Sequence, residues 1–188
     1  MKCLIVALVA LCPHLGAGEV KSWPPVEYSH VVAYCYDYTR DPRGSGIVFE
    51  DGTHHRGIIV PFTRNLLESK HAKLEELLNP SKELIDEEVD CYDPHHALVF
   101  YDKDWKPVAS IDLCFACADF RARPAHPAKE LGWREIEAFF KVLGMPTGDE
   151  VNFTELFERH QGPEPKPTKP VPSTDGDPFA PGASEIPR

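Results

Sequence analysis

The chain has 188 residues, of which 42% are hydrophobic and 27% charged, a composition typical of one globular domain. Thirty acidic and twenty basic side chains give a net charge of -10, which repels a phosphate backbone, so we expect no nucleic-acid partner. No stretch approaches the roughly 18 consecutive apolar residues of a membrane-spanning helix, so we also expect no transmembrane segment.

The N-terminus has the pattern of an export signal. A positive start, Met1-Lys2, precedes an apolar run that ends at Pro13, and small residues follow at positions 16–18. We expect residues 1–18 to be a signal peptide and the protein to be exported to the periplasm, the cell surface or the medium. Lipid attachment at Cys12 is disfavoured, because Leu11 stands where that modification prefers a small residue.

The rest of the chain divides by its proline content. Residues 19–29 contain two consecutive prolines and predict an extended lead-in, and residues 30–160 predict a single domain. Residues 161–188 are rich in proline and poor in aromatic side chains, which predicts a disordered tail. Such a tail suits an extended spacer and could also dock on a protein partner; no other partner can be named.

Three apolar runs open the domain. Residues 30–38 are rich in β-branched and aromatic side chains and predict a strand. Residues 46–50 and 57–61 flank Asp51-Gly52 and predict a hairpin with a long loop. That loop would hold His54, His55 and Arg56.

A helix is predicted next, with Thr63 as its N-cap and Asn79-Pro80 as its end. Its buried stripe would consist of leucines at helical spacing. We interpret His71, beside that stripe, as a histidine at the edge of the core rather than a ligand, and the acidic residues 81–90 as a solvated connector. The leucines are Leu66, Leu67, Leu74, Leu77 and Leu78.

Residues 97–101 and 108–113 read as two strands joined by a polar turn. Pairing these strands brings the chain before residue 97 close to the chain after residue 113. We therefore expect Cys91 to lie within bonding distance of Cys114 or Cys117.

Prolines predict a loop over residues 121–127, and helical periodicity predicts a helix that ends before Gly144 and Pro146. A last short helix would run from Phe153 to about His160. The fold class expected from these elements is α+β. It has a small antiparallel sheet of about five strands with two amphipathic helices, residues 66–78 and 133–143, on one face.

Cleavage after Gly18 would leave an even number of cysteines in an oxidising compartment, which indicates disulfides. These four disulfide candidates allow three pairings, and the spacing does not choose among them. They are Cys35, Cys91, Cys114 and Cys117.

Several functions are possible for the corner in which Cys91, His95, His96 and the Cys114–Cys117 pair would meet. The favoured one is a structural disulfide from Cys91 to one cysteine of the C-x-x-C pair, which needs no cofactor. The alternatives are a thiol redox centre and a zinc site. Haem attachment is excluded because Ala118 follows the pair where that chemistry needs histidine. The zinc ligands would come from Cys91, Cys114, Cys117 and either His95 or His96.

Catalytic motifs are absent from the sequence. There is no Gly-x-Ser-x-Gly, no phosphate-binding glycine-rich loop and no His-Glu-x-x-His. Cys91 and His95 have the residue types of a nucleophile and its base, but a cysteine among three others in an oxidising compartment would be lost to a disulfide. We assign no catalytic residue.

The order of these motifs resembles a group of small exported bacterial proteins without an established biochemical function. The likeness rests on the Cys-x-x-Pro-x-His segment at 91–96, the Phe-Tyr-Asp hairpin at 100–102 and the Cys-Phe-x-Cys pair at 114–117. It covers about residues 60–146 and implies no activity. It implies that Cys91, Pro94, His96, Cys114 and Cys117 form the defining corner of the domain, with Cys35 outside it.

Two functional hypotheses follow. The first is a non-enzymatic, exported, disulfide-stabilised domain that acts in binding or in the cell envelope. The second is a zinc-binding or thiol-redox protein that uses the same corner.

Overall fold

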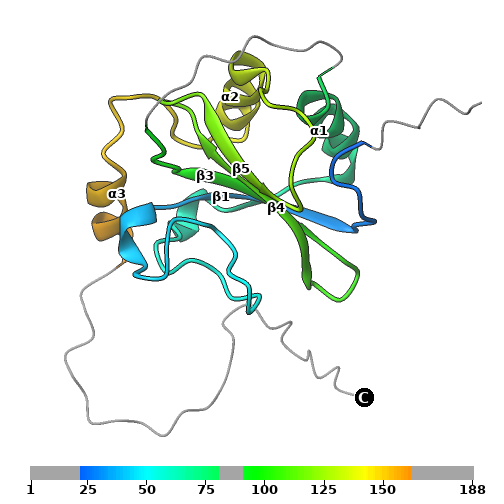
Figure 1. Ribbon diagram of the computed structural model, residues 1–188. Coiled ribbons are helices and arrows are strands. Elements are labelled where there is room, and N and C mark those ends of the chain that lie inside the picture. Colours follow the sequence, from blue (N-terminus) through cyan, green and yellow to red (C-terminus); the bar gives the residue numbers. More distant parts are fainter. Residues whose placement is uncertain (1–21, 81–90, 162–188) are drawn as a thin grey trace, which may run out of the picture.

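A computed structural model describes residues 22–80 and 91–161 of the chain. Its centre is one antiparallel sheet of five strands in the order β2-β1-β3-β4-β5 (Figure 1). The strands are β1 (His30–Cys35), β2 (Arg64–Asn65), β3 (His96–Tyr101), β4 (Pro107–Cys114) and β5 (Asp119–Arg123). The helices are α1 (His71–Leu78), α2 (Trp133–Val142) and α3 (Phe153–His160), with short 3-10 turns at Tyr38–Arg40, Val60–Phe62 and Glu68–Lys70.

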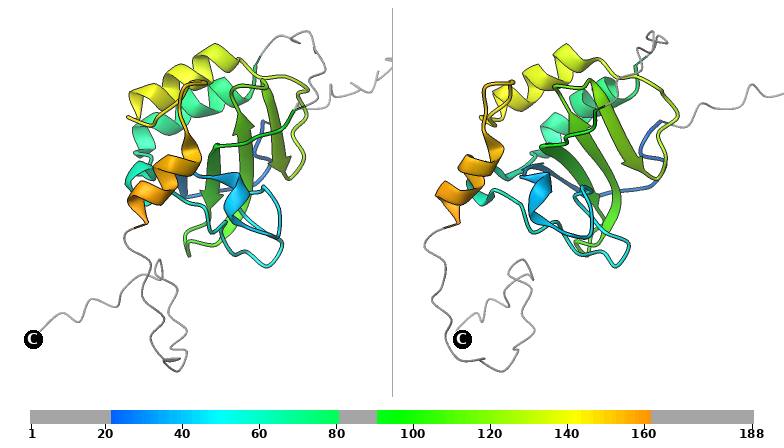
Figure 2. Two further views of the ribbon diagram at one scale, coloured as in Figure 1. Left: turned by 90° about the vertical axis from the view of Figure 1, so that its left-hand side faces the viewer. Right: turned by 60° about the vertical axis from the view of Figure 1, so that its left-hand side comes forward.

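Helices α1 and α2 lie side by side on one face of the sheet, which confirms the predicted α+β class (Figures 1 and 2). Each helix buries one apolar stripe at helical spacing, as an amphipathic helix on a sheet should. Helix α2 ends before Gly144, whose φ of 72° is easy only for glycine. The buried residues are Leu74, Leu77 and Leu78 of α1 and Ile136, Phe139 and Phe140 of α2.

The other face of the sheet is covered by the chain between β1 and β2 rather than by an α-helix (Figure 2). Successive strand residues point to opposite faces. In β1, Val31 and Ala33 therefore pack beneath the helices, whereas Val32 and Tyr34 pack against Ile47 and Ile58 of this covering segment. Burial on both faces explains why β1 and β3 are almost continuously apolar.

Ion pairs with two buried carboxylates hold the covering segment in shape. Arg40 contacts Asp37 at 2.9 Å, and Arg43 contacts Asp41 at 2.8 Å. The guanidinium of Arg43 holds the pKa of Asp41 well below its usual range, so this carboxylate stays charged where it also accepts a hydrogen bond from the Arg56 amide.

Three predictions about strands are wrong in detail. The runs at 46–50 and 57–61 form no strand ladder with each other; Val48 bridges to His54 and Ile58 bridges to Tyr36. Residues 121–123, predicted as loop, complete β5 along β4, and residues 64–65, predicted as the start of a helix, form strand β2 along β1. Edge strands this short and polar form because a neighbouring strand offers hydrogen bonds, which no local pattern reveals.

The first helix begins later than predicted. Thr63 ends a 3-10 turn instead of capping a helix, and α1 starts only at His71. Leu66 is buried, but Leu67 is 71% exposed and is not part of the stripe. The end before Asn79-Pro80 is confirmed.

The ordered domain also begins before His30, because Trp23 of the expected lead-in is fully buried. Its indole Nε1 donates to the carbonyl of Pro124 at 2.9 Å, and its ring packs edge-on against Phe100. The expected signal peptide, the acidic connector 81–90 and residues 162–188 of the expected tail lie outside the described residues.

Candidate functional site: the cysteine corner and its adjoining pocket

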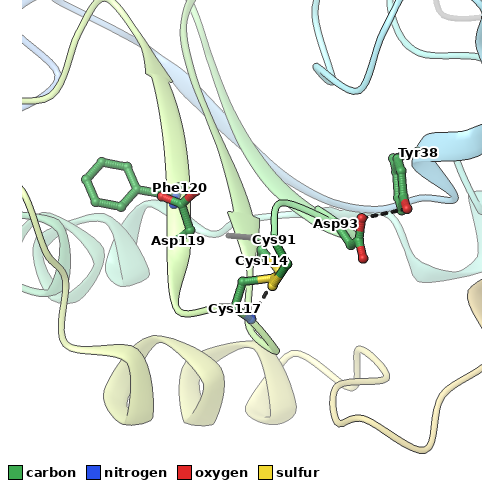
Figure 3. The surroundings of a disulfide bond; sticks show 7 residues. All are labelled: Tyr38, Cys91, Asp93, Cys114, Cys117, Asp119 and Phe120. Carbon is green, nitrogen blue, oxygen red and sulfur yellow. Dashed lines mark hydrogen bonds between the residues drawn. A yellow bond between two sulfur atoms is a disulfide. The ribbon is translucent and has the colours of Figure 1, made fainter. Parts of the chain in front are cut away.

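The β3–β4 hairpin brings the predicted cysteine corner together. Residues of β3 pair with β4 so that His96 lies opposite Leu113, which places the chain before β3 beside the chain after β4. A disulfide joins Cys91 to Cys117 there, with 5.9 Å between their Cα atoms and a sequence separation of 26 (Figure 3). The expected contact between Cys91 and the C-x-x-C pair is confirmed, and the partner is the second cysteine of that pair.

Cys114 remains a thiol beside this disulfide. The sulfur atoms of Cys91, Cys114 and Cys117 all lie within 4.8 Å of one another, and the amide of Cys117 donates to the Cys114 sulfur at 3.2 Å (Figure 3). Cys114 and Cys117 are buried, whereas Cys91 is exposed. Burial raises the pKa of the Cys114 thiol, which keeps it protonated and weakly nucleophilic near neutral pH.

Cys35 takes no part in the corner. It is a buried free thiol on β1, and burial raises its pKa to about 12. Among the described residues, the group of sulfur atoms that could share a metal does not include it.

Neither histidine joins the sulfur atoms, so the structure does not assemble the predicted zinc ligand set from described side chains. His95 Nδ1 lies 3.0 Å from the carbonyl oxygen of Tyr36, and His96 Nε2 lies 2.7 Å from that of Pro146. A carbonyl only accepts, so these ring nitrogens donate to it. Both carbonyls belong to chain segments distant in sequence. The spacing of the motif alone therefore could not exclude the histidines as zinc ligands.

Burial lowers the pKa of both histidines, that of His96 to about 3, so both rings are neutral at pH 7. A neutral imidazole that donates through one nitrogen keeps a lone pair on the other. The remaining nitrogen of each ring is therefore an acceptor. His95 also stacks on Phe153 of α3, with ring centroids 3.9 Å apart.

These two rings line a pocket of about 160 Å³ next to the disulfide. Its other walls come from the turn after β4 and from the segment that leads into α3, so no single sequence motif could have revealed it. Among the nine described residues that line it, none is a lysine or an arginine. The lining includes Asp93, His95, His96, Phe115, Asp149 and Phe153.

A buried carboxyl group on β4 was not predicted. Asp112 accepts hydrogen bonds from the Ile47 amide at 2.8 Å and the Tyr36 hydroxyl at 3.1 Å, and burial raises its pKa to about 6. The sequence carried a signal, since an acidic residue within a mostly apolar strand is unusual. Asp112 fastens the covering segment to the sheet.

His54 was expected in an open loop, but it joins a buried pair of tyrosines. The hydroxyl of Tyr101 lies 2.6 Å from the hydroxyl of Tyr34 and 2.6 Å from His54 Nε2. This group forms part of the packing between the covering segment and the sheet.

No helix in the part of the chain that the structure describes is long and apolar enough to cross a membrane. No protein-family model matches the chain, and neither the curated proteins nor the solved structures contain a match. The likeness to small exported bacterial proteins accordingly stays a prediction.

Proposed function

We propose that this protein is an exported, non-enzymatic binding domain stabilised by the Cys91–Cys117 disulfide. The disulfide is the observation that supports this proposal most directly, because such bonds persist in oxidising compartments outside the cytoplasm. The signal-like sequence at residues 1–18 agrees with it. The export signal and the disulfide are equally consistent with a role in the cell envelope.

The pocket beside the disulfide is the proposed binding site. Its volume of about 160 Å³ is comparable with cavities that hold a benzene-sized molecule. Its chemistry favours a small organic cation: Asp93 and Asp149 contribute carboxyl groups, the two imidazoles offer lone pairs, and no lysine or arginine is among the described residues of the lining. Phe115, which is partly exposed, supplies the aromatic surface on which a guanidinium or quaternary ammonium group can rest, whereas Phe153 is buried and stacked on His95.

An NMR titration with methylguanidinium chloride, matched in ionic strength with sodium chloride, tests this site. We expect saturable shifts of the His95 and Phe115 ring signals. Asp149→Asn should weaken the affinity by about threefold, because one carboxylate is removed from a cation site. Glu150→Gln is the matched control, since it neutralises the adjacent acidic residue, which does not line the pocket. Unsaturable shifts, or equal weakening by both substitutions, would contradict a pocket for cations.

The second candidate is metal binding by the corner, favoured by the three sulfur atoms within 4.8 Å of one another. Three thiolates suit zinc, which takes four ligands, but two of these sulfur atoms are bonded to each other in the disulfide. Metal binding thus requires reduction first. Zinc analysis of the protein purified with and without a thiol reductant tests it: one equivalent, lost in Cys114→Ser, would favour the metal site over the structural disulfide.

A further inference from the structure

The Cys91–Cys117 disulfide has a third sulfur atom at its side. Cys114 Sγ lies within 4.8 Å of both bonded sulfur atoms, a short movement away from the contact that thiol–disulfide exchange needs. The hydrogen bond from the Cys117 amide keeps the Cys114 sulfur at this place. A purely structural disulfide needs no such neighbour.

We propose that this corner is a thiol–disulfide exchange site in which Cys114 displaces Cys91 from Cys117. The Cys114 thiolate attacks Cys117 Sγ, the Cys114–Cys117 bond forms, and the Cys91–Cys117 bond breaks. The electron pair leaves on Cys91, which takes up the proton that Cys114 released. The exchange conserves atoms and electrons within the protein, so it needs neither an external oxidant nor a reductant. This activity goes beyond the proposed binding function and does not depend on it.

The solvent exposure of Cys91 makes its sulfur the better leaving group of the two bonded sulfur atoms. A thiolate that leaves into water is better solvated than one that stays buried. Cys91 is exposed, whereas Cys117, the alternative leaving group, is only 3% exposed. The product is an accessible Cys91 thiol that can capture the disulfide of a small molecule such as oxidised glutathione, forming a mixed disulfide and releasing one glutathione thiolate.

Burial also makes the exchange slow at neutral pH. Only the thiolate attacks, and the raised pKa of Cys114 keeps that form scarce. The exchange should therefore speed up as the pH rises towards that pKa.

Alkylation of the folded protein with iodoacetamide at about pH 8 tests the exchange, because alkylation traps each Cys91 thiol as it is released. Tryptic peptides separate the two states: Cys91 lies in residues 83–103, whereas Cys114 and Cys117 share residues 104–121. After exchange, the first peptide is alkylated and the second carries an internal disulfide. Before exchange, a disulfide links the two peptides.

Cys114→Ser should slow the labelling of Cys91 by about tenfold or more, because it removes the attacking sulfur. Cys35→Ser is the matched control: it removes the other buried thiol among the described residues and should leave the labelling rate unchanged. Equal Cys91 labelling in wild type and Cys114→Ser would overturn the proposal. If Cys114→Ser does not fold, the wild type alone decides, since Cys91 labelling without the internal Cys114–Cys117 disulfide also overturns it.

Discussion

Replacing Cys91 by serine removes the disulfide with little other disturbance, because Cys91 is exposed. Without the bond, the unfolded chain gains the freedom of a loop whose ends are 26 residues apart. The chain-entropy relation for a loop of this length gives about 3.5 kcal/mol of lost stability. That is a large share of the roughly 5–15 kcal/mol that stabilises an ordinary domain.

Urea unfolding followed by tryptophan fluorescence measures this loss, since Trp23 is buried against Phe100. We expect the unfolding free energy of Cys91→Ser to be about 3.5 kcal/mol below that of the oxidised wild type. Reduction of both proteins, which also opens any Cys114–Cys117 bond in the variant, should bring the wild type to the value of the variant. A variant within about 1 kcal/mol of oxidised wild type would refute the reasoning that the Cys91–Cys117 bond constrains the unfolded chain.

Three further predictions concern pH and packing. Folding lowers the pKa of His96 from its ordinary value of 6.5 to about 3, so the unfolded state binds more protons between these two pH values. The free energy of unfolding should therefore fall by about 4 kcal/mol as the pH drops from 6.5 towards 3. His96→Gln should flatten this pH dependence in urea titrations. Asp112 acts in the opposite direction, because folding raises its pKa from 3.8 to about 6. Its contribution to the free energy of unfolding is complete below pH 3.8, and about 3 kcal/mol of it is lost as the pH rises through 6. Asp112→Asn should remove that loss. A Cβ at Gly57 would collide with the backbone of Asp37, so Gly57→Ala should lower the thermal midpoint and reduce the free energy of unfolding by about 2 kcal/mol or more. Gly46→Ala is the control and should have little effect, because a Cβ there meets only ordinary van der Waals contacts. A steeper acid slope in His96→Gln, an unchanged slope in Asp112→Asn, or equal effects of the two glycine substitutions would contradict the respective prediction.

Elements with local signals were predictable from the sequence. The β3–β4 hairpin carries its own turn, in which the amide of Asp102 bonds to the carbonyl of Lys106. Helix α2 has both an apolar stripe and a glycine that stops it. Because the hairpin was predictable, so was the approach of Cys91 to the C-x-x-C pair, although not which of its two cysteines forms the bond.

Features that depend on distant partners were not predictable. Strand β5 follows from its pairing with β4, and its polar residues read as loop when taken alone. The roles of His95 and His96 depend on carbonyl oxygens 59 and 50 residues away in the chain. Each histidine, a candidate ligand in the alternative zinc site, donates a hydrogen bond to such a carbonyl and lines the pocket. The pocket itself joins three separate segments, so it exists only in the folded chain.

The central claim, an exported domain held by one disulfide, is tested most directly by the intact mass of the protein recovered from an exporting host. The mass is measured after alkylation under denaturing conditions, with elemental analysis of the same sample for zinc, iron and copper. We predict a chain that begins at Glu19, two alkylated thiols, one on Cys35 and one among the three cysteines of the corner, and no stoichiometric metal. A chain that retains residues 1–18, or one with four alkylated thiols and an equivalent of zinc, would contradict the account.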